Sequence, residues 1–271
     1  GSGGYWKIED LIEDYLTRDL EPPEPPDAAG AGDLTRHAGY YVNVAPRLGL
    51  TRFLTTLTDV RRVTAGEDRL EVAPAPGGDP EAWVPLGGGR FRGEEDPVAT
   101  HTVVATDAGR YLQIDGGTAG TYERAPALLV WGRWAVTAAV LALTASSLVF
   151  ALVWGPRALL GRLPRAEPLQ VRAWPLLCSV GFLAFTAGVA SLLGASGERV
   201  TTVNASTLGM ALGSVVLAGA AAVGLVQALR HREAVASCLT WWHSALVSAA
   251  GLLAAGWLAW HGLLGVRLWA Y

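Results

Sequence analysis

The chain has 271 residues, of which 51% are hydrophobic and only 17% are charged. Its net charge of −3 conceals two unlike parts: residues 1–125 hold 12 basic and 21 acidic residues, whereas residues 126–271 hold 9 basic and 3 acidic residues. This composition is typical of a membrane protein with one soluble portion. Because phosphate binding needs clusters of basic residues, the acidic soluble portion argues against nucleic acid as a partner.

The N-terminal segment YWKIEDLIEDYLTRDL, within residues 1–20, predicts an amphipathic helix. Its apolar side chains recur at helical spacing, and acidic side chains occupy the other face. We expect the apolar stripe to dock on another protein surface, because the stripe is unfavourable in water and an acidic helix does not suit anionic lipid. The stripe consists of Ile8, Leu11, Ile12, Tyr15 and Leu16.

Residues 21–36, which contain EPPEPPDAAGAGD, predict a Pro/Gly-rich linker. Residues 37–125 then predict an extracytoplasmic β domain of about eight short strands separated by turn signals, with one short helix in LTRFLTTL. Many short strands at this spacing favour a small antiparallel barrel or sandwich of the lipocalin-like kind. The expected strands are Tyr40–Val44, Val60–Thr64, Arg69–Ala73, Ala82–Leu86, Arg90–Arg92, His101–Thr106, Tyr111–Asp115 and Tyr122–Arg124.

Residues 126–271 contain four apolar stretches that are each long enough to cross a bilayer, which takes about 20 residues. We therefore predict an α+β membrane protein, in which a small antiparallel β-barrel or sandwich is followed by a four-helix transmembrane bundle. Tryptophans near the ends of the stretches are typical of membrane interfaces. The stretches are Trp134–Trp154, Ala173–Gly194, Ala205–Leu229 and Leu239–Leu264.

The loops between the stretches predict the orientation. Arginines outnumber acidic residues in the first loop, which includes Arg157 and Arg172, and in the third, which includes Arg230 and Arg232, so we expect both loops in the cytoplasm. Four crossings then place both termini and the β domain outside. The abundance of Ala, Gly and Pro, with Arg far above Lys, suggests a bacterial plasma membrane. Because the β domain needs an upstream signal to cross, we expect more protein before Gly1.

The third apolar stretch contains pairs of small residues four positions apart. This spacing lets helix backbones approach closely, so we expect this helix in the centre of the bundle. A general abundance of Ala and Gly gives the same pattern, and this alternative stays open. The small residues are Gly209, Gly213, Ala220 and Gly224.

The sequence contains no recognised catalytic motif. Residues 1–125 hold one serine, Ser2, and no cysteine, and the chain lacks S-x-x-K, K-T-G, G-x-S-x-G and H-E-x-x-H. His37 and His101 lie apart from other candidate ligands, whereas zinc needs three or four. We therefore predict no catalytic residue, metal or cofactor in this chain. Gly87-Gly88-Gly89 lacks the Lys-Ser/Thr of a phosphate-binding loop and predicts a hairpin turn.

Five segments of the chain resemble the C-terminal part of bacterial serine hydrolases of the β-lactamase/penicillin-binding-protein-like superfamily. In some members the catalytic domain is followed by a helix, a Pro-rich linker, a lipocalin-like β domain and membrane spans. The resemblance implies that residues 5–20 are the last helix of an upstream hydrolase domain, whose active site lies before Gly1. The matching segments are IEDLIEDYLTRDL, EPPEPP, HAGYY, WVPLGGGRFR and TYERAP.

The resemblance favours a non-catalytic membrane anchor with an extracytoplasmic β domain, taken from a serine-hydrolase-like protein. Two alternatives stay open: an accessory or assembly subunit of a larger membrane complex, and a barrel that encloses a small ligand or lipid. The expected partners are membrane lipid together with either the upstream hydrolase domain or another subunit of a membrane complex.

Overall fold

The structure is a computed structural model. It describes residues 7–8, 11–12, 15–20, 24, 26–28, 32–46, 49–114, 120–162, 168–192, 202–233, 235 and 237–266. The expected turn at 115–117, the second interhelical loop around Glu198 and Arg199, the tail 267–271 and much of the expected linker 21–36 therefore lie outside the described residues.

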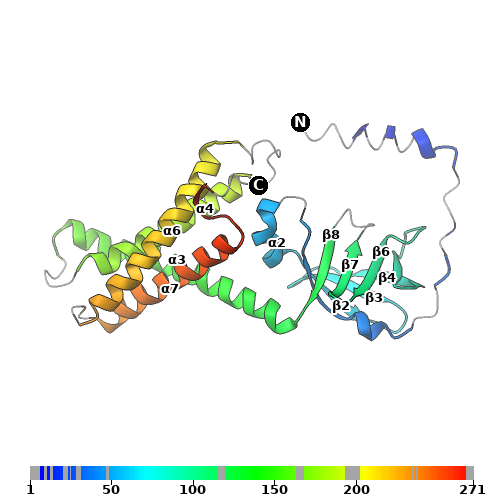
Figure 1. Ribbon diagram of the computed structural model, residues 1–271, viewed down its shortest axis with the longest axis horizontal. Helices are drawn as coiled ribbons and strands as arrows, with labels where there is room; N and C mark the ends of the chain where they lie inside the picture. The colour runs from blue at the N-terminus through cyan, green and yellow to red at the C-terminus, as the bar shows by residue number, and fades with distance from the viewer. Residues whose placement is uncertain are drawn as a thin grey trace. The chain divides into compact units, whose positions relative to one another are not determined.

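Eight antiparallel strands form a closed barrel in which each strand pairs with the next along the chain (Figure 1). This confirms the barrel form of the sequence prediction. Tyr41 lies opposite Arg61 in the first pair and Leu112 opposite Tyr122 in the last, and the register shifts between Pro85 and Gly87 where β4 pairs with β5. The strands are β1 (Gly39–Asn43), β2 (Val60–Ala65), β3 (Leu70–Ala75), β4 (Glu81–Gly87), β5 (Arg90–Gly93), β6 (His101–Thr106), β7 (Gly109–Ile114) and β8 (Gly120–Ala125).

Large apolar side chains from alternate strand positions fill the barrel. Burial alternates along β4, as expected when one face of the strand points inward and the other outward. Trp83, Tyr41 and Leu112 have no exposed surface at all. An eight-stranded barrel is just wide enough to be filled by side chains, and these side chains occupy its interior. The core is formed by Leu34, Tyr41, Val63, Leu70, Val72, Trp83, Phe91, Val103, Leu112, Ile114 and Tyr122.

The predicted Gly87–Gly89 hairpin is present between β4 and β5. Gly88 and Gly89 have φ values of 62° and 77°, and two central residues with positive φ are the geometry of a tight hairpin whose twist matches its strands. A Cβ on Gly89 would lie 2.5 Å from the backbone oxygen of Val103. Glycine is therefore required at this position both by the backbone conformation and by the close approach of β6.

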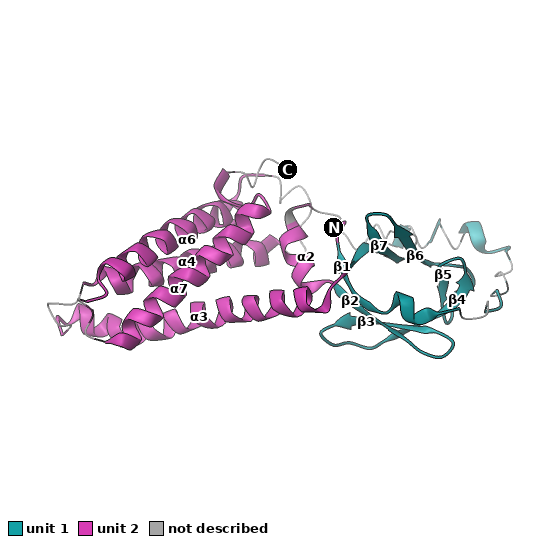
Figure 2. Cartoon of the chain, turned by 60° about the horizontal axis from the view of Figure 1, so that its bottom comes forward, with its two compact units in different colours: residues 1–43, 60–124 teal, residues 44–59, 125–271 magenta. Residues whose placement is uncertain are grey.

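The chain divides into two compact units, residues 1–43 with 60–124 and residues 44–59 with 125–271 (Figure 2). The first unit contains the barrel and the 3-10 helix η1 (Leu34–His37). The second unit contains four long helices together with the segment between β1 and β2. That segment forms the 3-10 turn η2 (Gly49–Thr51) and the helix α2 (Arg52–Thr58), where the sequence predicted one short helix.

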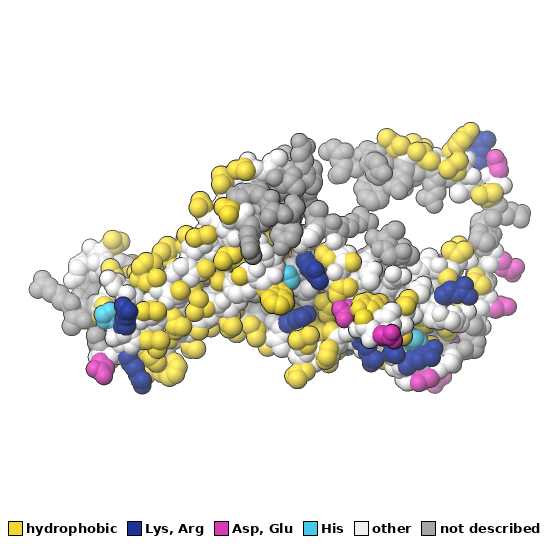
Figure 3. Space-filling view, viewed as in Figure 1, with side chains coloured by type: hydrophobic (Ala, Val, Ile, Leu, Met, Phe, Trp, Pro, Cys, Tyr) yellow, Lys and Arg dark blue, Asp and Glu magenta, His cyan; other side chains and the backbone are white. Residues whose placement is uncertain are grey.

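The second unit has four helices that are long and apolar enough to cross a membrane: α3 (Ala127–Leu159), α4 (Gln170–Leu192), α6 (Ala205–Arg230) and α7 (Cys238–Trp260). Hydrophobic side chains dominate their visible surface (Figure 3). Each helix coincides with one predicted span. The main differences are that α3 begins at Ala127 rather than Trp134, so that Arg133 lies on the helix, and that α7 ends at Trp260 rather than Leu264.

Small residues bring α4 and α6 into the most extensive helix contact of the second unit. A Cβ on Gly213 would lie 2.7 Å from both the Gly181 oxygen and the Phe185 nitrogen, so no larger residue fits there without moving a backbone. Gly224 is similarly close to Ser248, because a Cβ added at Gly224 would lie 2.6 Å from the Ser248 Oγ. Gly209 has only an ordinary contact with α4, and Ala220 is 3% exposed.

Helix α6 begins with a capping box. The Asn204 side chain accepts hydrogen bonds from the backbone nitrogens of Ser206 and Thr207, and the Thr207 hydroxyl accepts one from the Asn204 nitrogen at 2.9 Å. Asn204 satisfies backbone donors that the first turn of a helix leaves without partners.

Candidate functional site

The N-terminal stripe is exposed. Residues 7–8, 11–12 and 15–17 are helical, and the side chains of the stripe from Ile8 to Leu16 are between 54% and 68% exposed. The barrel core draws on residues from Leu34 onward and includes none of them. The stripe is therefore an apolar helix face that the folded core of the first unit does not use.

The barrel interior contains two buried histidines, which lie near aromatic rings. His101 stacks on Trp83 with ring centroids 4.0 Å apart, and its Nε2 lies 3.4 Å from the Glu81 carboxylate. His37 packs edge-on against Phe91, and its backbone oxygen accepts a hydrogen bond from the Tyr41 hydroxyl. Burial, followed by the positive charge of Arg36, lowers the pKa of His37. Both histidines thus belong to the packed interior of the barrel.

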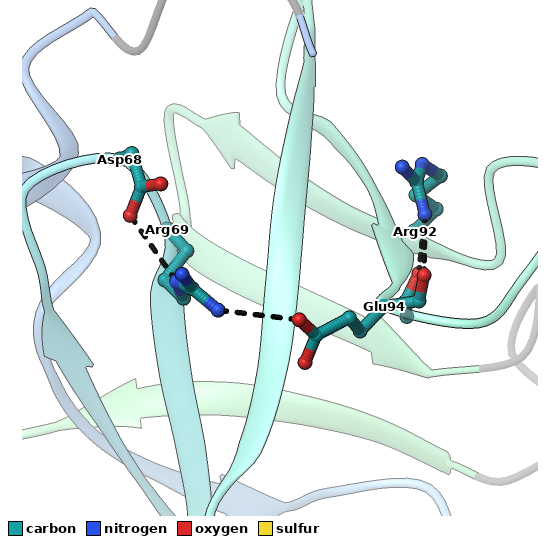
Figure 4. A network of polar contacts seen from close by, with 5 residues as sticks. Asp68, Arg69, Arg92 and Glu94 are labelled. Atoms are coloured by element: carbon teal, nitrogen blue, oxygen red, sulfur yellow. Dashed lines mark hydrogen bonds and ion pairs between the residues drawn. The ribbon is translucent and has the colours of Figure 1, made fainter. Parts of the chain in front are cut away.

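A polar network lies on the barrel surface (Figure 4). Arg69 forms ion pairs with Asp68 at 3.1 Å and Glu94 at 3.4 Å, and Arg92 donates to the Glu94 backbone oxygen. This network links the turn before β3 to the loop after β5. Because these ion pairs are solvent-exposed, each contributes about 0–1 kcal/mol, and their role is to fasten two loops. Among the described residues, no group of three or more histidine, cysteine, aspartate or glutamate side chains could hold a metal ion.

The short helix α2 packs on the long helices. Trp134 of α3 donates a hydrogen bond from Nε1 to the backbone oxygen of Leu57 at 2.8 Å, and Phe53 meets Phe185 of α4 edge-on with centroids 5.8 Å apart. Carbonyls at the end of a short helix lack intrahelical partners, and the indole satisfies one of them. The chain between β1 and β2 is thereby fixed to the helical unit.

A groove of about 1170 Å³ lies where α2 meets α3, α4 and α7. We call it the α2 groove. Its lining is mostly apolar and includes buried Val140, Phe185 and Leu258 as well as exposed Leu128 and Leu253. The groove has the concave form and the apolar lining that are typical of ligand sites.

A positive group lies at one end of the α2 groove. Arg133 lines the groove, and its guanidinium carbon lies 5.9 Å from the ring centroid of Trp257. The Trp257 ring in turn meets His261 at 4.5 Å. This end therefore presents the Arg133 guanidinium group beside an aromatic surface.

The sequence did not predict the α2 groove or the place of Arg133 in it. Arg133 lies just before the predicted span and Arg52 lies in the predicted short helix, more than 80 positions away in the chain. Nothing in either local pattern says that the two helices pack together. The one available signal was that Arg133 has no acidic neighbour within the same helix turn.

Comparison with known proteins adds no relative to this picture: no protein-family model, no curated protein and no solved structure matches the chain.

Proposed function

We propose that this chain is the non-catalytic, membrane-anchoring part of a serine-hydrolase-like protein, and that its N-terminal helix holds the hydrolase domain. The observation that carries the proposal is the exposed stripe of Ile8, Leu11, Ile12, Tyr15 and Leu16. Each of these side chains gains about 1.5–3 kcal/mol on full burial, so the stripe favours a bound state. The N-terminal and barrel segments resemble the C-terminal parts of serine hydrolases, and this resemblance supports a hydrolase domain as the partner that covers the stripe.

The chemistry of the helix supports a protein partner over a lipid surface. Four acidic residues, at positions 9, 10, 13 and 14, lie between the members of the stripe, while Lys7 and Arg18 are the only basic residues nearby. Helices that lie on anionic membranes carry an excess of lysine and arginine on the polar face. A packed protein surface with basic groups around an apolar patch suits this helix better.

The alternative is an accessory subunit of a membrane complex, in which the stripe docks on a separate polypeptide. The same exposed stripe supports it, and the two proposals differ in whether the partner belongs to the same chain. A ligand-binding barrel is supported less well, because large side chains such as Trp83 and Tyr41 occupy the barrel interior.

We propose further that the helices lie in a bacterial plasma membrane with both termini and the barrel outside. The arginine excess of the first and third loops supports this orientation. Cys238 offers a direct measurement, because it is exposed at the start of α7 whereas Cys178 is buried. A membrane-impermeant maleimide should label Cys238 only after the cells are permeabilised. Equal labelling of Cys238 in intact cells would show that the protein has the opposite orientation.

The docking proposal is tested on the native protein, recovered from its own membranes through an antibody against the barrel. A fluorophosphonate probe should label a hydrolase domain on the same polypeptide but no residue of the segment described here. Leu11→Asp should weaken the contact between the N-terminal helix and the hydrolase domain, so that limited proteolysis cleaves the chain near this helix more readily. The melting temperature of the barrel should stay unchanged. Val98→Asp is the matched control, since Val98 is also an exposed apolar residue but lies in the loop between β5 and β6.

Each result has one meaning. Separate polypeptides that co-purify, without a hydrolase on the same chain, would replace the first proposal by the accessory-subunit alternative. Labelling within residues 1–271 would contradict the non-catalytic assignment. A lower barrel melt in Leu11→Asp, with proteolysis unchanged, would show that the helix belongs to the barrel core.

A further inference from the structure

The α2 groove has a buried floor and an exposed, apolar rim. Val140, Phe185 and Leu258 on the floor are no more than 8% exposed. On the rim, Leu128, Leu141 and Leu253 are 85%, 51% and 62% exposed. These rim residues lie on helices with the length and composition of membrane spans. The groove therefore opens on a surface in contact with hydrocarbon, and its occupant has to be apolar along most of its length.

The end of the groove near α2 has the opposite character. Arg133 is half-buried, lines the groove and lies against Trp257. Among the ion pairs formed by the described residues, none joins Arg133 to an acidic side chain. A half-buried guanidinium group without an acidic partner favours an anion, and its planar array of donors matches phosphate oxygens.

We propose that the α2 groove binds a membrane lipid with an anionic phosphate headgroup, whose acyl chains fill the apolar floor and whose phosphate is held by Arg133. Complementarity of charge selects the headgroup, and the apolar lining selects the chains. Trp257 supplies a ring surface next to Arg133, where the indole and the guanidinium stabilise each other.

The size and depth of the groove fit this occupant. Its volume of about 1170 Å³ exceeds the range of about 300–1,000 Å³ that is usual for small-molecule pockets. Arg133 lies about 9 Å along α3 from the first residue, Ala127, at a rise of about 1.5 Å per residue. Trp131 and Trp134, on either side of it, are residues that concentrate at the level of lipid headgroups. A phosphate held by Arg133 is therefore at the depth of the membrane interface.

The test is native mass spectrometry of the full chain in a mild detergent. Dioleoylphosphatidylglycerol and dioleoylphosphatidylcholine are added separately, because they share acyl chains and differ in headgroup charge. We expect the anionic lipid to bind at least about tenfold more tightly, because the choline cation of the zwitterionic headgroup offsets the charge of its phosphate and is repelled by the arginine. Excess inorganic phosphate should not displace the bound lipid, because it cannot fill the apolar floor.

Two sets of variants separate the headgroup from the chains. Arg133→Gln should lower the affinity for the anionic lipid about tenfold, to the level of the zwitterionic lipid. Arg133→Lys should keep the preference for the anionic lipid. Arg157→Gln is the matched control, because Arg157 is exposed at the far end of the same helix. Gly132→Leu and Gly256→Leu should weaken both lipids, since both glycines line the groove and an added Cβ meets no atom within 4 Å.

Specific outcomes would overturn the proposal. One is equal affinity of the unmodified chain for the two lipids, and another is an equal effect of Arg133→Gln and Arg157→Gln. A third is unchanged lipid binding in both glycine variants, which would place the lipid outside the groove. Gly219→Leu on α6 serves as their control, because Gly219 is not in the groove and also has free space. Displacement of a co-purifying protein by Gly132→Leu, with lipid affinity unchanged, would identify a polypeptide as the occupant instead.

Discussion

The barrel and the helical bundle are held together by different kinds of core. The barrel is filled by large side chains, with Trp83, Tyr41 and Tyr122 at no more than 1% exposure. The centre of the bundle instead contains small residues, and at Gly181 and Gly213 the backbones of α4 and α6 nearly touch. This difference follows from the solvent. In water, burying large apolar side chains stabilises the fold, whereas in lipid that driving force is absent and close backbone packing replaces it.

The polar groups of the two units differ in the same way. In the bundle, some buried hydroxyls bond to backbone groups within the unit, whereas those of Ser244 and Ser248 have no hydrogen-bond partner among the described residues. Ser179 donates to the Pro175 oxygen at 3.1 Å, and Ser214 donates to the Ala211 oxygen while accepting from the Gly265 nitrogen. In the barrel, ion pairs such as Arg69 with Glu94 lie at the surface, where water also solvates them. Hydrocarbon offers no such solvation, so hydroxyls such as those of Ser179 and Ser214 gain by bonding to the backbone inside the bundle.

The largest effect that we predict is on the barrel core. Trp83→Ala should lower the free energy of unfolding of the barrel by about 3–5 kcal/mol, because it leaves a large cavity between His101 and Phe91. Calorimetry of the full chain in detergent measures the barrel and helical transitions in one experiment. The helical transition should stay in place.

Val104→Ala is the control for this loss. Val104 is 40% exposed on β6, so its truncation should change barrel stability by no more than about 0.5 kcal/mol. If Trp83→Ala and Val104→Ala had similar effects, the barrel would not depend on its aromatic interior, and the contrast with the bundle would fail.

A smaller effect is expected at the contact between α4 and α6. Gly213→Leu should destabilise the helical unit by about 1–3 kcal/mol, because a side chain at this position forces the two backbones apart. Loss of the helical circular dichroism signal on heating measures it, and the barrel transition should not move. This result would show that close packing of α4 against α6 requires a small residue at position 213.

Gly219→Leu, on the same helix, supplies the comparison. Its added Cβ meets no atom within 4 Å, so the substitution should be tolerated. A melt that falls equally in both variants would mean that glycine is needed for a general property of α6. It would then not reflect the contact with α4.

Much of the fold could be predicted because the determining patterns are local. Glycine- and aspartate-rich turns separate the eight strands, and the hairpin at Gly88 and Gly89 follows from the conformational freedom of those two residues. Length and apolar composition were enough to locate α3, α4, α6 and α7. Helix ends were less well defined, as for α3, because an apolar window does not show how far backbone hydrogen bonding continues beyond it.

By itself, the sequence determined the order and type of the elements, because alternation along strands, turn chemistry and apolar length each act over a few residues. The tertiary structure alone decided which surfaces meet. It grouped the segment between β1 and β2 with the helical unit, joined Leu57 to Trp134 and placed Arg133 beside Trp257 in the α2 groove. Such contacts depend on side-chain shape and on hydrogen-bond partners far apart in the chain, and no local pattern of residues encodes them.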